Sequence, residues 1–128
     1  MTAPNIVGVT TVTGKTVQFN LSDTLETSML VNSANSGAVY KIESIIVANV
    51  DGASTADITV SLKNSASGGT NFKIASNIDV PPKSTIVVVD KASAFYMEEN
   101  REISCQASAA NDLSIILSYE EIMWFSSL

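Results

Sequence analysis

The sequence contains no histidine, the side chain that most often serves as a general base and as a metal ligand. Ser-His-Asp and Cys-His catalytic arrangements are therefore impossible, and no other nucleophile stands at a recognisable spacing from a base. We expect that the protein is not an enzyme and that it uses no cofactor.

Basic side chains are also scarce, with 7 Lys and Arg against 13 Asp and Glu and a formal net charge of -6. Affinity for nucleic acid comes mainly from clustered Lys and Arg, and no two basic residues adjoin here. We expect no nucleic-acid binding. Charged residues make up only 16% of the chain, below the roughly 25% of an average soluble domain, so the surface must consist largely of Ser, Thr, Asn and Ala.

Cysteine occurs once, so no internal disulfide is possible. Cys105 alternates with Ile103 and Ala107, which predicts a buried thiol on a strand. No stretch approaches the roughly 18 apolar residues of a membrane span, and the first residues lack the pattern of a signal peptide. We expect no membrane contact, and a protein that stays in the cytosol or leaves it within a larger particle.

Short alternating apolar runs recur about every ten residues, with Gly, Pro, Asn and Asp at the breaks and no sustained helical pattern. The length of 128 residues suits a single domain spanning residues 1–128. We predict an all-β fold, an antiparallel β-sandwich of about 8–10 strands. Jelly-roll wiring and other Greek-key wirings remain open at this point.

Two pairs of runs read as β-hairpins. Residues 40–50 and 57–63 flank an Asp-Gly turn, and residues 103–108 and 113–120 flank the turn at 110–112. In the first run Ile42 and Ile46 share one face while Ile45 takes the other, which predicts a central strand covered on both sides.

Other stretches carry more specific predictions. Residues 71–78 alternate with an irregularity near Ser76, and Pro81-Pro82 marks a corner between sheets. The run 84–90 is predicted to be a strand buried on both faces. Residues 25–31 suit a strand better than one helical turn, since Thr and Val favour strands.

Both ends of the chain are apolar and are candidates for contact with another protein. Residues 1–13 form either an edge strand or an arm lying on a neighbour, with Ile6, Val7 and Val9 as its contact residues. Residues 122–128 form an apolar tail that either closes the sandwich or docks on a partner. Its anchors would be Met123, Trp124 and Phe125, because large apolar side chains dominate such contacts.

Two weaker hypotheses concern ligands. Glu98, Glu99 and Glu102, with Asp112 nearby, offer oxygen atoms of the kind that Ca²⁺ takes, although no calcium-loop motif is present. Four aromatic side chains could stack on sugar rings, although aromatic residues at inward strand positions usually belong to the core. These are Tyr40, Phe72, Tyr96 and Trp124.

Four segments together resemble small β-sandwich virion proteins of tailed bacteriophages, including marine and cyanobacterial ones. They are VYKIESIIVANVDG at 39–52, ADITVSL at 56–62, IDVPPKST at 78–85 and ISCQASAANDLSIILSYEEI at 103–122. The resemblance covers residues 38–122 approximately, and neither the N-terminal stretch nor the Trp124-Phe125 tail belongs to it.

The resemblance implies a structural role in a virion. Such proteins serve as capsid decoration (cement) proteins, as neck or tail components, or as fibre-associated parts. We therefore expect a homo-oligomer, with a trimer as one form, that binds the major capsid protein or other virion proteins. The alternative is a tail or fibre module that binds host glycan through loops 65–70 and 32–37.

Overall fold

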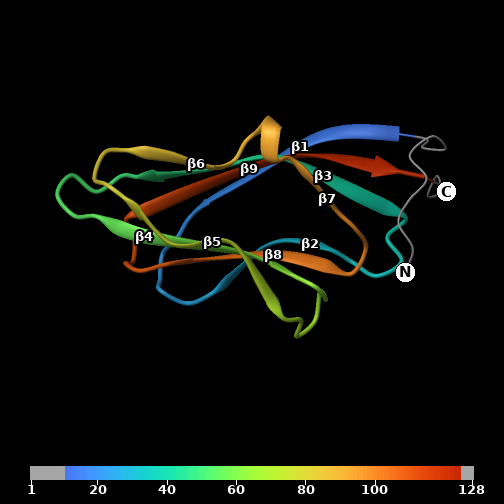
Figure 1. Ribbon diagram of the computed structural model, residues 1–128, viewed down its shortest axis with the longest axis horizontal. Coiled ribbons are helices and arrows are strands. Elements are labelled where there is room, and N and C mark those ends of the chain that lie inside the picture. Colours follow the sequence, from blue (N-terminus) through green and yellow to red (C-terminus); the bar gives the residue numbers. More distant parts are fainter. Residues whose placement is uncertain (1–10, 125–128) are drawn as a thin grey trace.

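The computed structural model describes residues 11–124, which fold into nine strands in two packed antiparallel layers (Figure 1). Ile6, Val7, Val9 and Phe125, four of the predicted contact residues, lie outside the described range. The strands are β1 (Thr11–Asn20), β2 (Thr27–Asn32), β3 (Ala38–Asn49), β4 (Ala56–Lys63), β5 (Asn71–Val80), β6 (Thr85–Val89), β7 (Phe95–Met97), β8 (Arg101–Ala107) and β9 (Leu113–Met123). The predicted antiparallel β-sandwich is confirmed.

The five-stranded sheet has the order β1-β9-β3-β6, and β7 also pairs with β3 beside β6. The four-stranded sheet has the order β2-β8-β4-β5. With β7 set aside, each sheet interleaves strands from the two halves of the chain, and this is the wiring of a jelly roll. A short 3-10 helix, η2 (Lys91–Ser93), precedes β7. Asp90 caps its N-terminus, where the Asp90 carboxylate accepts hydrogen bonds from the backbone N–H groups of Ala92 and Ser93.

Both predicted hairpins are wrong, because their strands lie in different sheets. β3 pairs with β9, β6 and β7, while β4 pairs with β8 and β5. β8 and β9 are likewise in opposite layers. Alternation of apolar and polar residues shows which face of a strand is buried. It does not show whether the next strand pairs with it in the same sheet or lies in the other sheet, because the same face is buried in both cases. The predicted corner at Pro81-Pro82 is confirmed, since β5 and β6 belong to different sheets.

β3 is central in its sheet, as predicted, but its faces differ from simple alternation. The pairing with β9 shifts register between Ile42 and Ser44, so Ile42, Ile45 and Val47 all belong to the buried core. A β-bulge of this kind places one extra residue in a strand and reverses the alternation beyond it. Ile46 therefore points to the outer face and is only half-buried.

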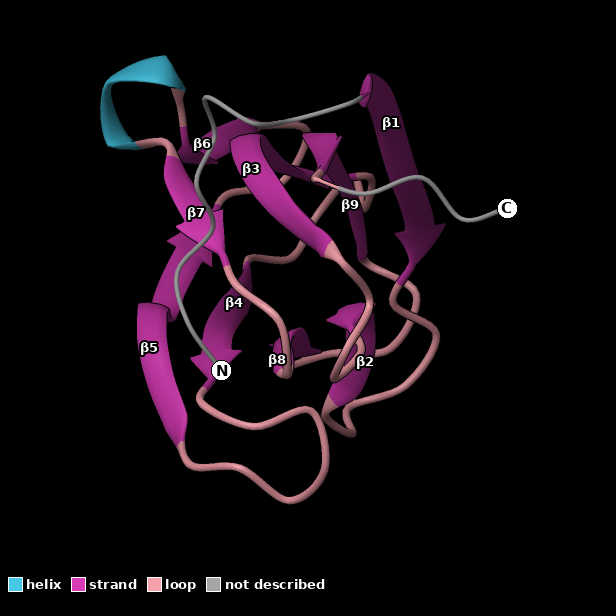
Figure 2. Ribbon diagram, turned by 90° about the vertical axis from the view of Figure 1, so that its right-hand side faces the viewer, coloured by secondary structure: helices cyan, strands magenta, loops and turns pink. Residues whose placement is uncertain are grey.

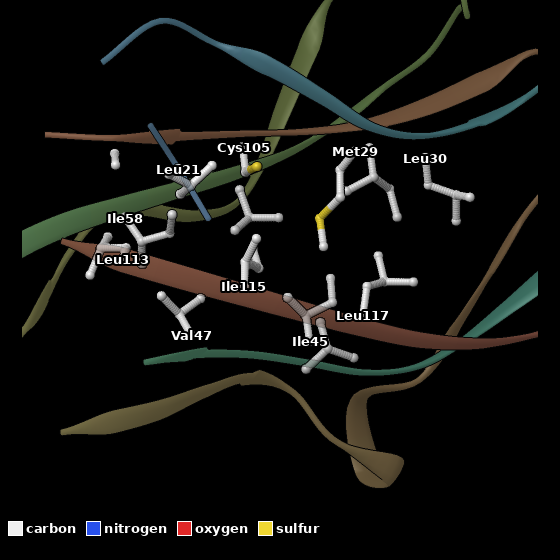
Figure 3. Packing of buried hydrophobic residues seen from close by; sticks show 14 of the residues in the cluster. Leu21, Met29, Leu30, Ile45, Val47, Ile58, Cys105, Leu113, Ile115 and Leu117 are labelled. Carbon is white, nitrogen blue, oxygen red and sulfur yellow. The ribbon is translucent and has the colours of Figure 1, made fainter. Parts of the chain in front are cut away.

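The core fills the space between the layers, and Figure 3 shows part of its packing. Ile58 and Val60 of β4 face Ile115 and Leu117 of β9 across the sandwich, all four fully buried. Cys105 is buried among them, as predicted. Within residues 11–124, no helix is long and apolar enough to cross a membrane.

Three further strand predictions are settled. Residues 27–32 form a strand, which decides against the helical turn. In β5 the register shifts between the Ile58–Ile78 and Val60–Ala75 pairs, and Asn77 has φ 50°, so the predicted irregularity near Ser76 is a bulge. The run 84–90 is not buried on both faces: β6 is an edge strand and Val87 is 60% exposed.

Candidate functional site: an open groove between two edge strands

β5 and β6 are the edge strands of opposite layers, and they border the same side of the sandwich. Between them lies a groove of about 260 Å³, here called the edge groove. Its walls are Ile74, Ala75 and Ile78 of β5 and Ile86, Val87 and Val88 of β6. Every lining residue is apolar, so the groove offers buried contact to an apolar partner and little recognition of charge.

The β5 side chains at this edge face the interior and yet remain in contact with solvent. Ile78 pairs with Ile58, and Phe72 pairs with Leu62, both core-facing residues of β4. Paired residues of neighbouring strands project to the same face. Nevertheless Ile78 is 44% exposed and Phe72 is 57% exposed. The two layers therefore do not close over Phe72 and Ile78, which remain largely uncovered, whereas Val80 at the end of the strand is fully buried.

The backbone at the edge groove is also open to a partner. β5 pairs only with β4, and β6 pairs only with β3, within the part of the chain that the structure describes. Each edge strand therefore has one row of N–H and C=O groups with no strand alongside. Such edges are templates for the addition of another strand.

A second open edge lies on the opposite side of the molecule. β1 pairs only with β9 among the described strands and forms the other edge of the five-stranded sheet. Figure 2 shows β1 and β5 at opposite sides of the molecule. β1 is largely exposed, with Val12 54% exposed. Residues 11–13 of the predicted arm form the start of this strand, paired with the end of β9.

The predicted tail is partly a strand. Ile122 and Met123 are the last residues of β9, and Met123 pairs with Thr11 on one side and Ala38 on the other. The backbone N–H of Trp124 donates a hydrogen bond to the carbonyl oxygen of Gly37 at 3.2 Å. Met123 and Trp124 thus lie at the end of the five-stranded sheet where β1 begins at Thr11.

The acidic residues at 98–102 serve local structure. Glu99 is buried, and its Oε2 accepts a hydrogen bond from the backbone N–H of Gly37 at 2.9 Å. Glu98 pairs with Arg101 at 3.7 Å. Across residues 11–124, no three acidic or cysteine side chains gather in a group that could hold a metal ion. The structure therefore gives the calcium hypothesis no support.

The four aromatic residues do not form one platform. Tyr40 and Tyr119 pack with ring centroids 4.9 Å apart against the core, and burial, followed by the negative charge of Glu121, raises the pKa of Tyr40 to about 12. Tyr96 lies on β7 and is 48% exposed, whereas Phe72 lies in the other sheet.

The two loops proposed to bind glycan do come together at one end of the sandwich. The 98–100 turn links them: Glu99 holds Gly37 of one loop, and the Asn100 side-chain oxygen accepts a hydrogen bond from the backbone N–H of Ala66 in the other at 3.2 Å. This end therefore presents loops 33–37, 64–70 and 98–100 side by side.

Sequence reasoning found the strands that line the edge groove but missed the groove itself. The apolar pattern of residues 71–78 and 84–90 was visible, and both flank the Pro81-Pro82 corner. What was missing was the knowledge that both strands are edges. The one available signal is the Pro-Pro corner, because proline is confined to the edges and ends of sheets.

No protein family model matches this sequence, and no curated protein matches it. Solved structures do match its fold. A chain of the Bacillus endospore appendages, a novel family of disulfide-linked pili, aligns with a TM-score of 0.53 and 13% identity, covering 90% of each chain. A chain of the acidic stable capsid structure of Helicobacter pylori bacteriophage KHP30 aligns with a TM-score of 0.53 and 11% identity, covering 91% of each chain. At such low identity these similarities show a shared β-sandwich fold.

Proposed function

We propose that this protein is a structural component of a tailed-bacteriophage virion, in the first place a head decoration protein. It associates with copies of itself and binds the lattice of the major capsid protein, which it stabilises by adding buried interface area. It performs no catalysis. The sequence resemblance described above indicates the virion, and the structure supplies surfaces suited to assembly.

The observation that carries the proposal is the pair of open edges on opposite sides of the sandwich. β1 forms one, and β5 and β6 form the other around the edge groove. Proteins that remain monomeric usually protect edge strands with charges, prolines or covering loops. Here Ile78, Phe72 and Val87 stay exposed at the edge, which suits a surface that a partner covers.

The fold and composition agree with this role. Jelly rolls occur in viral capsids, although a fold does not by itself determine function. The two similar structures described above come from assemblies, one a pilus and one a capsid. Only 16% of the residues in the chain are charged, and so low a content of charge reduces the electrostatic repulsion between copies packed at high density.

The proposal is tested by the mass of the purified full-length chain in solution and by its copy number in virus particles. Light scattering coupled to gel filtration should give a multiple of 13.5 kDa. Quantitative mass spectrometry of particles should find hundreds of copies for a head protein, whereas a handful would indicate the neck or tail. A chain that stays monomeric at high concentration contradicts the proposal.

A second candidate function is a glycan-binding module at the tail or fibre tip. The observation in its favour is that loops 33–37 and 64–70 meet at one end of the sandwich. Binding on a glycan array that is lost when the 64–70 loop is replaced, together with low copy number at the tail tip, would favour it over a decoration protein.

A further inference from the structure

We propose that the edge groove receives residues 5–10 of a neighbouring copy as an added strand between β5 and β6. The inference rests on the proposed function, because it names the partner and the place of self-association. The segment, Asn-Ile-Val-Gly-Val-Thr, lies outside the described residues, so the argument rests on the groove, on the position of Thr11 and on the sequence.

The chemistry of the segment matches the groove. No charged side chain occurs before Lys15, and every residue lining the groove is apolar. In an extended chain Val7 and Val9 project to the same side about 7 Å apart, as strand geometry requires. In strand addition the backbone hydrogen bonds supply affinity, while alternate side chains fill pockets. Val7 and Val9 would face the core, against Ile74 and Ile78.

Residues 5–10 cannot reach the groove of their own chain. Across the five-stranded sheet, Thr11 pairs with Met123, which pairs with Ala38, so these three residues form one row perpendicular to the strands. Val87 pairs with Ile46, and these two residues form a second row. These rows are about 24 Å apart along β3, and β1 and β6 are three strand spacings, about 14 Å, apart, giving a separation of about 28 Å. Val7 is four residues before Thr11 and reaches at most about 14 Å. Its own groove is therefore out of reach.

The resulting contact is head-to-tail. Each copy would give its N-terminal segment from the β1 side of the molecule and receive a segment on the β5 side (Figure 2). Two different surfaces meet in such an interface, so the assembly closes into a ring, such as a trimer, or continues as a chain. The segment would cover Ile78 and the unpaired edges of β5 and β6, which explains why these are uncovered in a single copy.

Disulfide trapping between two differently tagged full-length chains tests this inference. One chain carries Val7→Cys and the other carries Ile78→Cys. We expect mixing under mild oxidation to give a disulfide-linked heterodimer, whereas the unsubstituted chain, whose Cys105 is buried, gives none. Ile86→Cys, on the other wall, is a second acceptor in case Ile78→Cys disturbs folding. The control acceptor is Ile116→Cys, 39% exposed on the outer face of the five-stranded sheet, where we expect at least tenfold less heterodimer.

The outcomes separate the two proposals. If light scattering shows oligomers but neither Ile78→Cys nor Ile86→Cys is trapped, the chain self-associates elsewhere and the inference is overturned while the proposed function stands. Equal trapping at Ile116→Cys also overturns it, because the segment would then have no preferred site. If the chain is monomeric at every concentration, the proposed function fails and the inference fails with it.

Discussion

The side-chain amide of Asn49, at the end of β3, donates a hydrogen bond to the backbone carbonyl of Val80, at the end of β5, at 2.8 Å. The two residues belong to opposite layers. The same amide group donates to the carbonyl of Ser54 at 2.9 Å, and the amide oxygen accepts from the N–H of Asp51 at 2.9 Å. Asn49 is 2% exposed, so one buried side chain fastens the sheets and the link between β3 and β4.

Asn32 has the same role nearer the opposite end of the sandwich. It lies on β2, is fully buried, and donates to the carbonyls of Ala38 and Met97, both in the other sheet. Ser36 donates to its amide oxygen at 2.6 Å. Contacts within the apolar core are not directional, whereas the hydrogen bonds of these two asparagines fix the position of one sheet relative to the other.

We predict that Asn49→Ala lowers the free energy of unfolding by about 3 kcal/mol, because the buried carbonyl of Val80 and the part-buried backbone groups of Ser54 and Asp51 lose their partner at once. Urea denaturation followed by circular dichroism measures the change. Asn71→Ala is the control, since Asn71 is exposed and bonds only to Glu26 among the contacts described for its side chain, and it should change stability by less than about 1 kcal/mol. Equal effects of the two substitutions would contradict the assigned role of Asn49.

Asp57 of β4 and Asp79 of β5 lie directly opposite each other on the outer face of the four-stranded sheet. Their mutual hydrogen bond, then desolvation and the charge of Asp79, raise the pKa of Asp57. A carboxyl group whose pKa is raised by folding favours the folded state only below its unfolded pKa, and that contribution is lost as the pH rises through the folded pKa.

We therefore predict that Asp57→Asn slightly raises the melting temperature at pH 7. The gain should shrink as the pH falls below about 4, where the side chain at position 57 is neutral in the substituted and the unsubstituted protein alike. Thermal melts between pH 3 and 7 provide the measurement. Asp112→Asn, which removes the same charge from the turn between β8 and β9, serves as the control. No gain at pH 7 would show that the pair does not repel.

Tyr40 should make the stability of the protein depend on pH in the alkaline range. Its pKa of about 12 exceeds that of an unfolded tyrosine, near 10, so the unfolded chain loses this proton first and stability falls as the pH rises from about 10 to 12. We predict that Tyr40→Phe reduces this alkaline loss while preserving packing against Tyr119. Urea denaturation at pH 9 and 11 compares the two, with Tyr96→Phe on an exposed ring as the control. An unchanged alkaline slope would contradict the prediction.

Cys105 should be inert in the folded protein. It is 1% exposed, and burial, with a smaller effect of the Glu26 charge, raises its pKa to about 12. Since the thiolate is the reactive form, we predict negligible reaction with an aromatic disulfide reagent at pH 8 and one reactive thiol per chain in urea. Rapid reaction without denaturant would show that the four-stranded sheet opens locally.

The sequence was sufficient to locate most strands, because one buried face leaves a period of two, as at Ile58 and Val60 of β4. It was also sufficient for the bulge near Ser76 and the corner at Pro81-Pro82, where particular residues interrupt the pattern. Cys105 was placed correctly for the same reason.

Partners of strands were not predictable in the same way. Asp51-Gly52 suits a hairpin turn, yet here it belongs to a link between layers fixed by Asn49. The bulge between Ile42 and Ser44 has no proline or glycine to mark it. The apolar sequence of β6 is typical of a buried strand. In the structure β6 pairs with β3 at Ile45–Ala48, and β7 pairs with the same side of β3 at Tyr40–Ile42. No further described strand pairs with the other side of β6. The edge groove follows from these long-range pairings and could not be predicted without them.

β9 runs between β1 and β3, although its residues follow both by many tens of positions. During synthesis the ribosome releases β1 and β3 long before the strand that joins them. Until residues 113–123 emerge, the five-stranded sheet lacks its β9 strand, and β1 and β3 of the nascent chain have no strand between them. The five-stranded sheet is therefore completed only once residues 113–123 have left the ribosome, and a ribosome stalled before Leu113 would hold a chain without a finished layer.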